Sequence, residues 1–574
     1  MLQWPLRSNL VVGVNAVAME AYKLRMNSLT GNAFQRLAVI CLMSSMAAPL
    51  PGQQAPMVDV PGGSIRGAIS PAGAVFKGIP FAEPPVGELR WREPQPVKPW
   101  RGVRDATNYS AACVQNPIGS GAFIGRLARR YGVNYAAPPW NLSEDCLYLN
   151  IWTPEWPVKE PRAVMFWLHG GSNRLGSGTE SGYDGTELAK HGVILVTINY
   201  RLGALGFFAH PELSGESPHH SSGNYGLLDQ IAALRWVHEN IAQFGGDPSR
   251  VTVFGESAGG IDAGMLMCSR LTIGLFQRVI VESGPVLGLA YPRSLKDGEH
   301  FGELLAEAAL KSHRAGSSIK RLRALPAQTI LRAASEAAKH ELDPGFVLDS
   351  WVLARTPSEV FAAAAQQPAR LIIGNNGREA SVFRGSPSGA MVSVEGPKKT
   401  ARICYGNLAP FVLALYAIDT RAGRTAAADG WMNDALVTCP SLVMATLNVA
   451  AGHPSFVYQF RRSIPGKGQD DLGSFHSLEL PFVFKAFNNP VWTWLSFGKQ
   501  DYMLADTMQS YWTNFAKIGD PNGGGLPQWR PFSEKSGDYI EFGDDGRAAP
   551  RQGVRPALCD LDVSKLKQRL IENQ

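Results

Sequence analysis

The chain has 574 residues, of which 45% are hydrophobic and 18% are charged, and this ordinary composition excludes a disordered or fibrous protein. The net charge of +6 comes from 55 basic and 49 acidic residues spread along the sequence. Because no Lys/Arg run alternates with aromatic residues, the charge pattern predicts a normally solvated surface and no nucleic-acid partner.

The N-terminal segment differs from the rest of the chain. Residues 37–47 form a short apolar run that ends in small residues. We interpret residues 1–47 as a secretory signal peptide in which residues 1–25 are an over-extended start or a long n-region, since Met26 is a better start for such a signal. A piece of apolar core is the alternative. The run is too short to span a membrane, and we expect no stable membrane anchor.

Short apolar runs alternate with helix-like segments along the rest of the chain. The runs predicted as strands are residues 163–168, 192–199, 251–254, 278–281, 371–373 and 456–460. Residues 227–244 have helical periodicity, residues 296–366 are predicted to form surface helices, and the Gly/Pro-rich residues 117–142 a long irregular loop. Apolar strands separated by helices predict an α/β fold with a large, mostly parallel sheet that helices cover on both faces.

A glycine-flanked serine follows the predicted strand 251–254. Residues 255–260 read GESAGG, which places Ser257 at the centre of a G-x-S-x-G pattern. Where a strand turns sharply into a helix, a serine projects its hydroxyl above the sheet edge, and glycines two positions away permit close backbone packing. The pattern predicts Ser257 as a catalytic nucleophile, with a bare turn as the alternative.

A second glycine-containing turn lies upstream, directly after the predicted strand 163–168. Residues 169–172 read HGGS, and Gly176 and Gly178 follow. Glycines let backbone N–H groups approach a substrate carbonyl and stabilise the charge that builds on its oxygen. The turn is predicted to line the substrate pocket; a plain strand-ending turn is the alternative.

Further motifs occur in order along the chain. They are GIPFAEPPVGELRW at 78–91, EDCLYLN at 144–150, NYRLG at 199–203, NYGLLDQ at 224–230 and FGGDP at 244–248. Together with the serine motif, they resemble the type-B carboxylesterase family, which includes the cholinesterases, from about residue 58 to the C-terminus. The resemblance implies an α/β-hydrolase fold and a single domain over residues 58–570.

The resemblance also implies the two partners of the serine. Residues 374–379 (GNNGRE) are similar to the family's acid motif, which makes Glu379 the triad acid. Residues 473–481 (GSFHSLELP) are similar to its histidine motif, which makes His476 the base. From the residues alone, Glu379 is equally compatible with a solvated surface acid, although its place after the strand 371–373 fits the carboxyl edge of a parallel sheet.

Other positions around the site are assigned in the same way. The resemblance implies that the N–H groups of Gly171, Ser172 and Ala258 form the oxyanion hole. Ser172 replaces a third glycine common in the family, and Ser283 matches a serine that the family keeps near its triad. Asp262 stands where the family usually has a serine, so its carboxylate either alters the pKa of the triad histidine or faces solvent.

Six cysteines remain once the predicted signal segment is removed, and an even number permits disulfides in an exported protein. The resemblance implies a bond between Cys113 and Cys146. Cys439 and Cys559 match positions that are paired in some members, with free buried thiols as the alternative. Cys268 and Cys404 are expected to be unpaired.

These observations predict a secreted or periplasmic serine esterase. Ser257 attacks the carbonyl of a small-molecule ester, His476 takes its proton, and water then hydrolyses the acyl-enzyme. No metal or cofactor is expected, and the sequence does not indicate the natural ester or the oligomeric state. Two alternatives remain: a lipase for longer acyl chains, with residues 114–142 as a lid, and a non-catalytic adhesion protein, a class that typically loses the nucleophile or the histidine.

Overall fold

The computed structural model describes residues 55–116, 119–135, 140–288, 292–311, 318–340, 345–383, 402, 406–416, 424–553 and 558–561. The chain divides into two units, Met1–Gln54 and Ala55–Gln574, and all described residues belong to the second. The predicted signal segment 1–47 and Cys404 lie outside the described residues.

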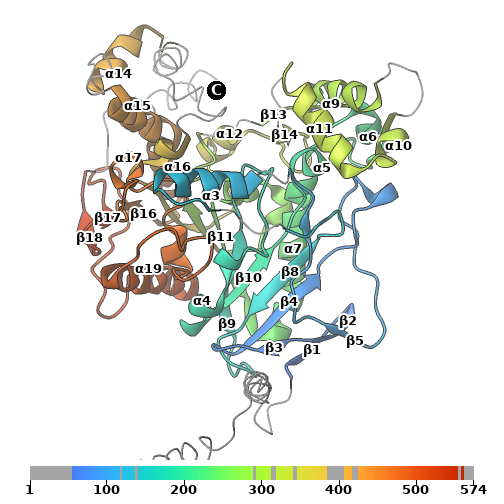
Figure 1. The fold of residues 1–574 in the computed structure, drawn as a ribbon, viewed down its shortest axis with the longest axis horizontal. Coiled ribbons are helices and arrows are strands. Elements are labelled where there is room, and N and C mark those ends of the chain that lie inside the picture. Colours follow the sequence, from blue (N-terminus) through green and yellow to red (C-terminus); the bar gives the residue numbers. More distant parts are fainter. Residues whose placement is uncertain are drawn as a thin grey trace, which may run out of the picture. The chain divides into compact units, whose positions relative to one another are not determined.

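An 11-stranded sheet forms the centre of the second unit (Figure 1). Its strands, in spatial order, are β18 (Ala548–Arg551), β17 (Tyr539–Phe542), β16 (Ser455–Phe460), β15 (Arg370–Asn376), β12 (Arg278–Glu282), β11 (Gly246–Glu256), β9 (Arg162–Leu168), β10 (Ile194–Ile198), β8 (Tyr148–Trp152), β4 (Ala74–Pro80) and β3 (Ala68–Ile69). The strands from β17 to β10 pair in parallel, and the pairings outside them are antiparallel. The predicted α/β fold with a mostly parallel sheet is confirmed, and each predicted strand is present.

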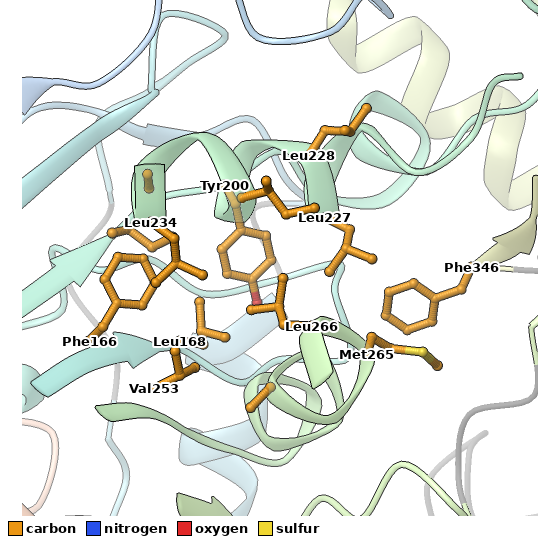
Figure 2. Close-up of a cluster of buried hydrophobic side chains, with 14 of the residues drawn as sticks. Phe166, Leu168, Tyr200, Leu227, Leu228, Leu234, Val253, Met265, Leu266 and Phe346 are labelled. Carbon is orange, nitrogen blue, oxygen red and sulfur yellow. The ribbon is translucent and has the colours of Figure 1, made fainter. Parts of the chain in front are cut away.

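Both faces of the sheet are covered by helices, as the alternation along β9 shows. Val164, Phe166 and Leu168 belong to one hydrophobic cluster, with side chains of α7 (Tyr225–Asn240) and α8 (Ala258–Cys268), whereas Ala163, Met165 and Trp167 belong to a second, with α19 (Lys499–Ile518). Figure 2 shows part of the first cluster, where Phe166 and Leu168 lie near Leu234 of α7 and Leu266 of α8. Because side chains of a strand point alternately to opposite faces, burial on both faces explains the continuous apolar run of each strand.

The predicted helices are also present. The periodic segment 227–244 forms α7, followed by a 3-10 turn at Ile241–Phe244. The segment 296–366 contains α9 (Leu295–Leu310), α10 (Ser318–Arg323), α11 (Ala327–Ala337) and α12 (Pro357–Ala362). Within the described ranges, no helix combines the length and the apolar character needed to cross a membrane.

The segment 117–142, predicted as an irregular loop, contains helix α3 (Gly119–Arg130), so the prediction is wrong there. Leu127 and Ala128 of α3 are buried in the second hydrophobic cluster. Arg130 pairs with Asp471 and donates a hydrogen bond to the carbonyl oxygen of Ser381 at 2.8 Å. These tertiary contacts outweigh the low helix propensity of the glycines that misled the sequence analysis.

Two disulfides link distant parts of the chain. Cys113 is bonded to Cys146, 33 residues away, and Cys439 is bonded to Cys559, 120 residues away. The alternative of free thiols at the second pair is therefore excluded. Cys268 is unpaired, as expected.

Candidate active site

Ser257 lies at the turn between the end of β11 and the start of α8. Its backbone has φ 55° and ψ −121°, a conformation that non-glycine residues rarely adopt and that costs conformational energy. Two backbone hydrogen bonds hold it: the Ser257 N–H donates to the Glu282 carbonyl at 2.8 Å, and the Ser257 carbonyl accepts from the Ile261 N–H at 3.0 Å. The strand–turn–helix context expected for a nucleophilic serine is present.

The glycines two positions on either side of Ser257 are required by close backbone packing. A Cβ atom at Gly259 would lie 2.0 Å from the Leu168 carbonyl oxygen. A Cβ atom at Gly255 would lie 2.5 Å from the carbonyl carbon of Gly259. Since α8 begins this close to the end of β9, no larger residue fits at either position.

The HGGS turn lies beside Ser257. A Cβ atom at Gly170 would lie 3.2 Å from the Cβ atom of Ser257, and Gly171 and Ser172 have φ values of 107° and 57°. In the described part of the chain, the N–H groups of Gly171, Ser172 and Ala258 donate no hydrogen bond to another protein group. Three unpaired backbone donors near one hydroxyl can stabilise an oxyanion.

His476 and Glu379 are in direct contact. The distance from Nδ1 of His476 to Oε2 of Glu379 is 2.6 Å, and both residues are buried. The other carboxylate oxygen of Glu379 accepts a hydrogen bond from the Asn376 N–H at 2.6 Å, and the Glu379 N–H donates to Asn433 Oδ1 at 2.7 Å. Glu379 is therefore a buried, oriented carboxylate, and the alternative of a solvated surface acid is wrong.

The second ring nitrogen of His476 lies at the serine turn. Nε2 is 3.2 Å from Oε1 of Glu256, the residue directly before Ser257, and this oxygen also accepts a hydrogen bond from Ser477 Oγ at 2.7 Å. Among the described residues, no hydrogen bond joins the Ser257 hydroxyl to His476. Catalytic hydrogen bonds are often long without substrate and tighten in the Michaelis complex, so this geometry is compatible with proton transfer.

The buried carboxyl groups of Glu256, Glu379 and Glu479 act on the charge of the imidazole, and Glu282 is a further buried carboxyl group that interacts with Glu256. Burial raises the pKa of Glu282 to about 8, and it raises the pKa of Glu256 and of Glu479 above their ordinary value. Burial by itself lowers the pKa of His476, but the carboxylates of Glu256 and Glu379 outweigh burial and raise it. Neither Glu256 nor Glu479 can be recognised as a site residue from the sequence: both lie inside the family motifs, but the residue types do not show which way their side chains point.

The two remaining predicted positions have different surroundings. Ser283 Oγ donates to Glu479 Oε1 at 3.2 Å, which places it beside the buried carboxyl groups near His476. Asp262 is fully buried, so the alternative that it faces solvent is wrong. Its carboxylate accepts hydrogen bonds from Asn173 and Gln230, not from His476.

A serine at a strained strand–helix turn, on a mostly parallel sheet and beside a buried histidine–glutamate pair, defines an α/β-hydrolase. The model of the carboxylesterase family matches residues 54–559. Carboxylesterase 1D of Rattus norvegicus is 35% identical over 519 residues, which cover 83% of this chain and 86% of the relative. Fumonisin B1 esterase of Sphingopyxis macrogoltabida is 37% identical over 490 residues, which cover 84% of this chain and 85% of the relative. The chain belongs to the carboxylesterase family.

Solved structures agree with this assignment. The carboxylesterase EST55 of Geobacillus stearothermophilus is similar with a TM-score of 0.73 and 33% identity, over 86% of this chain and 97% of that one. A PNB esterase structure is similar with a TM-score of 0.75 and 31% identity, over 90% of this chain and 99% of that one. The protein is a serine carboxylesterase that hydrolyses carboxylic esters.

Proposed function

We propose that Ser257, His476 and Glu379 form the catalytic triad of this carboxylesterase. The observation that carries the proposal is the 2.6 Å contact between His476 Nδ1 and Glu379 Oε2, with the opposite ring nitrogen at the turn that holds Ser257. Glu379 orients the imidazole and stabilises its protonated form. The buried hydrogen-bond partners of Glu379 keep its carboxylate in place for this role.

The reaction follows from these positions in two half-reactions. His476 Nε2 accepts the proton of the Ser257 hydroxyl while Oγ bonds to the ester carbonyl carbon, and the carbonyl oxygen becomes an oxyanion held by the N–H groups of Gly171, Ser172 and Ala258. The imidazolium returns its proton to the leaving alcohol as the C–O bond breaks. Water then attacks the acyl-enzyme with His476 again as base, which releases the acid and restores Ser257.

We also propose that residues 58–570 form one catalytic domain and that the protein is secreted or periplasmic. The disulfides Cys113–Cys146 and Cys439–Cys559 support export, because disulfides persist in oxidising compartments. The proposed substrates are small-molecule carboxylic esters. A panel of p-nitrophenyl esters of increasing acyl length separates an esterase from a lipase. Fumonisin B1 should be tested as a separate substrate, because one relative is named as its esterase.

Substitution of the serine tests the triad. Ser257→Ala is expected to abolish p-nitrophenyl acetate hydrolysis and stoichiometric labelling by a fluorophosphonate probe, because the attacking oxygen is gone. Ser335→Ala is the matched control, since the Ser335 hydroxyl lies on the exposed surface of α11 and, among the described residues, bonds only to the Leu331 carbonyl. Full activity in Ser257→Ala would refute the assignment, and loss of labelling in Ser335→Ala would show that the probe reports something else.

A further inference from the structure

The residue five positions after Ser257 has an unusual environment for an acid. Asp262 lies on α8 and is fully buried, and within the described part of the chain its two carboxylate oxygens accept hydrogen bonds only from uncharged groups. Asn173 Nδ2 donates to Oδ1 at 2.8 Å and Gln230 Nε2 donates to Oδ2 at 2.6 Å. A buried carboxylate without a cation is costly, so a purely structural position would be filled better by a neutral side chain.

We propose that Asp262 is a positioning residue of the esterase, whose ionised carboxylate holds residues 169–178, the oxyanion loop, in place through Asn173. The proposal rests on the assignment of the oxyanion donors in the preceding section. Asn173 directly follows Ser172, one of those donors, and its own φ is 54°. Ser172 and Asn173 both have positive φ, a conformation that non-glycine residues rarely adopt, so the contacts of Asn173 help to hold the turn that carries the Ser172 N–H.

Asn173 is held from several sides. Its amide oxygen accepts a hydrogen bond from the Tyr200 hydroxyl at 3.2 Å, its backbone carbonyl accepts from the Gly203 N–H at 2.7 Å, and its amide nitrogen donates to Asp262. Tyr200 also donates to the His169 carbonyl at 2.7 Å, at the start of the same loop. Among these contacts of Asn173, the bond to Asp262 is the one whose strength depends on charge. A hydrogen bond to an ionised acceptor is roughly twice as strong as one between neutral groups.

The surroundings of Tyr200 keep its hydroxyl fixed against Asn173 and the His169 carbonyl. Its ring stacks on His169 with centroids 4.4 Å apart, and Figure 2 shows it among the apolar side chains of α7 and α8, near Leu227 and Leu266. On the far side of Asp262, Gln230 extends from α7, and its Oε1 has no hydrogen-bond partner in the described part of the chain. A neutral Asp262 carboxyl can therefore donate its proton to Gln230 after that amide turns over.

Asp262 is expected to change its charge near neutral pH. Burial raises its pKa to about 7, and the hydrogen bonds from the side-chain amides of Asn173 and Gln230 oppose the rise. The elements that pack against α8 carry the titratable side chains His169 after β9, Asp229 on α7, Glu256 on β11, Glu282 on β12 and Glu359 on α12, and Tyr200 contacts Asn173. Of these, the Tyr200 hydroxyl donates to the His169 carbonyl and to Asn173, and Asp229 is neutralised by its ion pair with Arg201.

The test compares the wild type with Asp262→Asn across pH. The variant keeps the shape of the side chain but is never charged. We expect kcat/KM of the wild type to exceed that of the variant by about fivefold at pH 8.5, with the difference in kcat and KM nearly unchanged. At pH 5.5, where the wild-type carboxyl is also neutral, the ratio of the two kcat/KM values should approach one. The ratio cancels the ionisation of His476, which both proteins share.

A second pair of measurements separates positioning from a structural role. Since a buried charge opposes folding, Asp262→Asn should unfold at an equal or higher temperature than the wild type at pH 8.5 while being the slower enzyme. In an Asn173→Ala background, Asp262→Asn should have no pH-dependent effect on kcat/KM, because the connection to the loop is already missing. Should Asp262→Asn fail to fold, the ratio of wild type to Asn173→Ala gives the same test, since it should also fall as the pH is lowered.

A ratio that does not change with pH, or one that changes equally in the Asn173→Ala background, would overturn the proposal. Failure of the proposed triad looks different: neither the wild type nor Asp262→Asn would then be labelled by a fluorophosphonate at Ser257. If both proteins are labelled and the ratio is flat, the triad stands and the role of Asp262 falls.

Discussion

Nε2 of His476 lies 3.2 Å from Oε1 of Glu256, so the base of the proposed triad contacts a carboxylate through each of its ring nitrogens. Burial lowers the pKa of His476, and the two carboxylates more than reverse this and raise it. Only the neutral imidazole accepts the serine proton. Activity should therefore be lost as the pH falls through a value above the ordinary histidine pKa of about 6.5.

The variant Glu256→Gln tests this relationship. Without the Glu256 charge, the pKa of His476 should fall, and the acid limb of kcat/KM against pH should move to lower pH by about one unit. The measurement is a pH profile of p-nitrophenyl acetate hydrolysis, with Glu534→Gln, an exposed glutamate distant in sequence from every motif, as the control. An acid limb at the same pH in Glu256→Gln would show that Glu256 does not set the charge of His476.

The contact between Glu379 and His476 predicts the effect of removing the acid. Glu379→Gln keeps the size of the side chain but cannot stabilise the imidazolium, and its amide group favours the wrong tautomer of the ring. We expect kcat to fall by about 10³- to 10⁴-fold with little change in KM, as for other triads that lose the acid. Steady-state kinetics check this, and a loss below tenfold would mean that another carboxylate serves as the acid, with Glu479, whose charge also raises the pKa of His476, as a candidate.

The parts of the site that sequence analysis could predict are those that local chain geometry determines. The G-x-S-x-G pattern after an apolar strand predicts the turn at Ser257, since the packing of Gly255 and Gly259 is a local requirement. Glu379 and His476 are 97 residues apart, and their contact follows from the packing of β15 and its following loop, so only the family resemblance pointed to them.

The positions that the sequence does not predict correctly are those whose environment is determined by tertiary packing. The sequence alone does not decide whether Asp262 is buried or exposed, because the side of α8 that faces the core depends on the packing of α7 and the oxyanion loop. Helix α3 was missed because its stability comes from the burial of Leu127 and from the contacts of Arg130, which the local composition does not indicate. Long-range contacts of this kind leave no periodic or compositional pattern in one sequence.

The close approach of α8 to β9 predicts that Gly259→Ala is destabilising. The new Cβ would lie 2.0 Å from the Leu168 carbonyl oxygen, and this backbone cannot shift without moving β9. We expect the free energy of unfolding to fall by about 3 kcal/mol or more, measured by denaturant titration.

Gly215→Ala, in α6 (Pro211–Glu216), is the matched control for Gly259→Ala, because a Cβ at Gly215 meets nothing within 4 Å. Alanine in a helix is favoured over glycine, so this variant should be as stable as the wild type or slightly more stable. Equal stability of the two variants would contradict the packing at the turn.

The disulfide Cys113–Cys146 should affect both stability and catalysis. Two residues after Cys113, Gln115 forms a reciprocal pair of hydrogen bonds with Gly176 of the oxyanion loop: Nε2 donates to the Gly176 carbonyl at 2.9 Å, and Oε1 accepts from the Gly176 N–H at 2.9 Å. Cys113→Ser/Cys146→Ser removes a cross-link over 33 residues, so we expect the free energy of unfolding to fall by about 4 kcal/mol.

The kcat of the same double variant should also fall. Without the disulfide, the segment that carries Gln115 is less firmly held, and its hydrogen bonds to Gly176 no longer stabilise the oxyanion loop. Gln115→Ala should reproduce the loss in kcat with a much smaller loss of stability, and Cys268→Ser, which removes an unpaired thiol, should change neither. Denaturant titration and steady-state kinetics on the three variants separate the two effects. If the double variant is less stable but keeps its full kcat at a temperature where it is folded, the bond stabilises the chain without supporting the loop, and the connection through Gln115 is wrong.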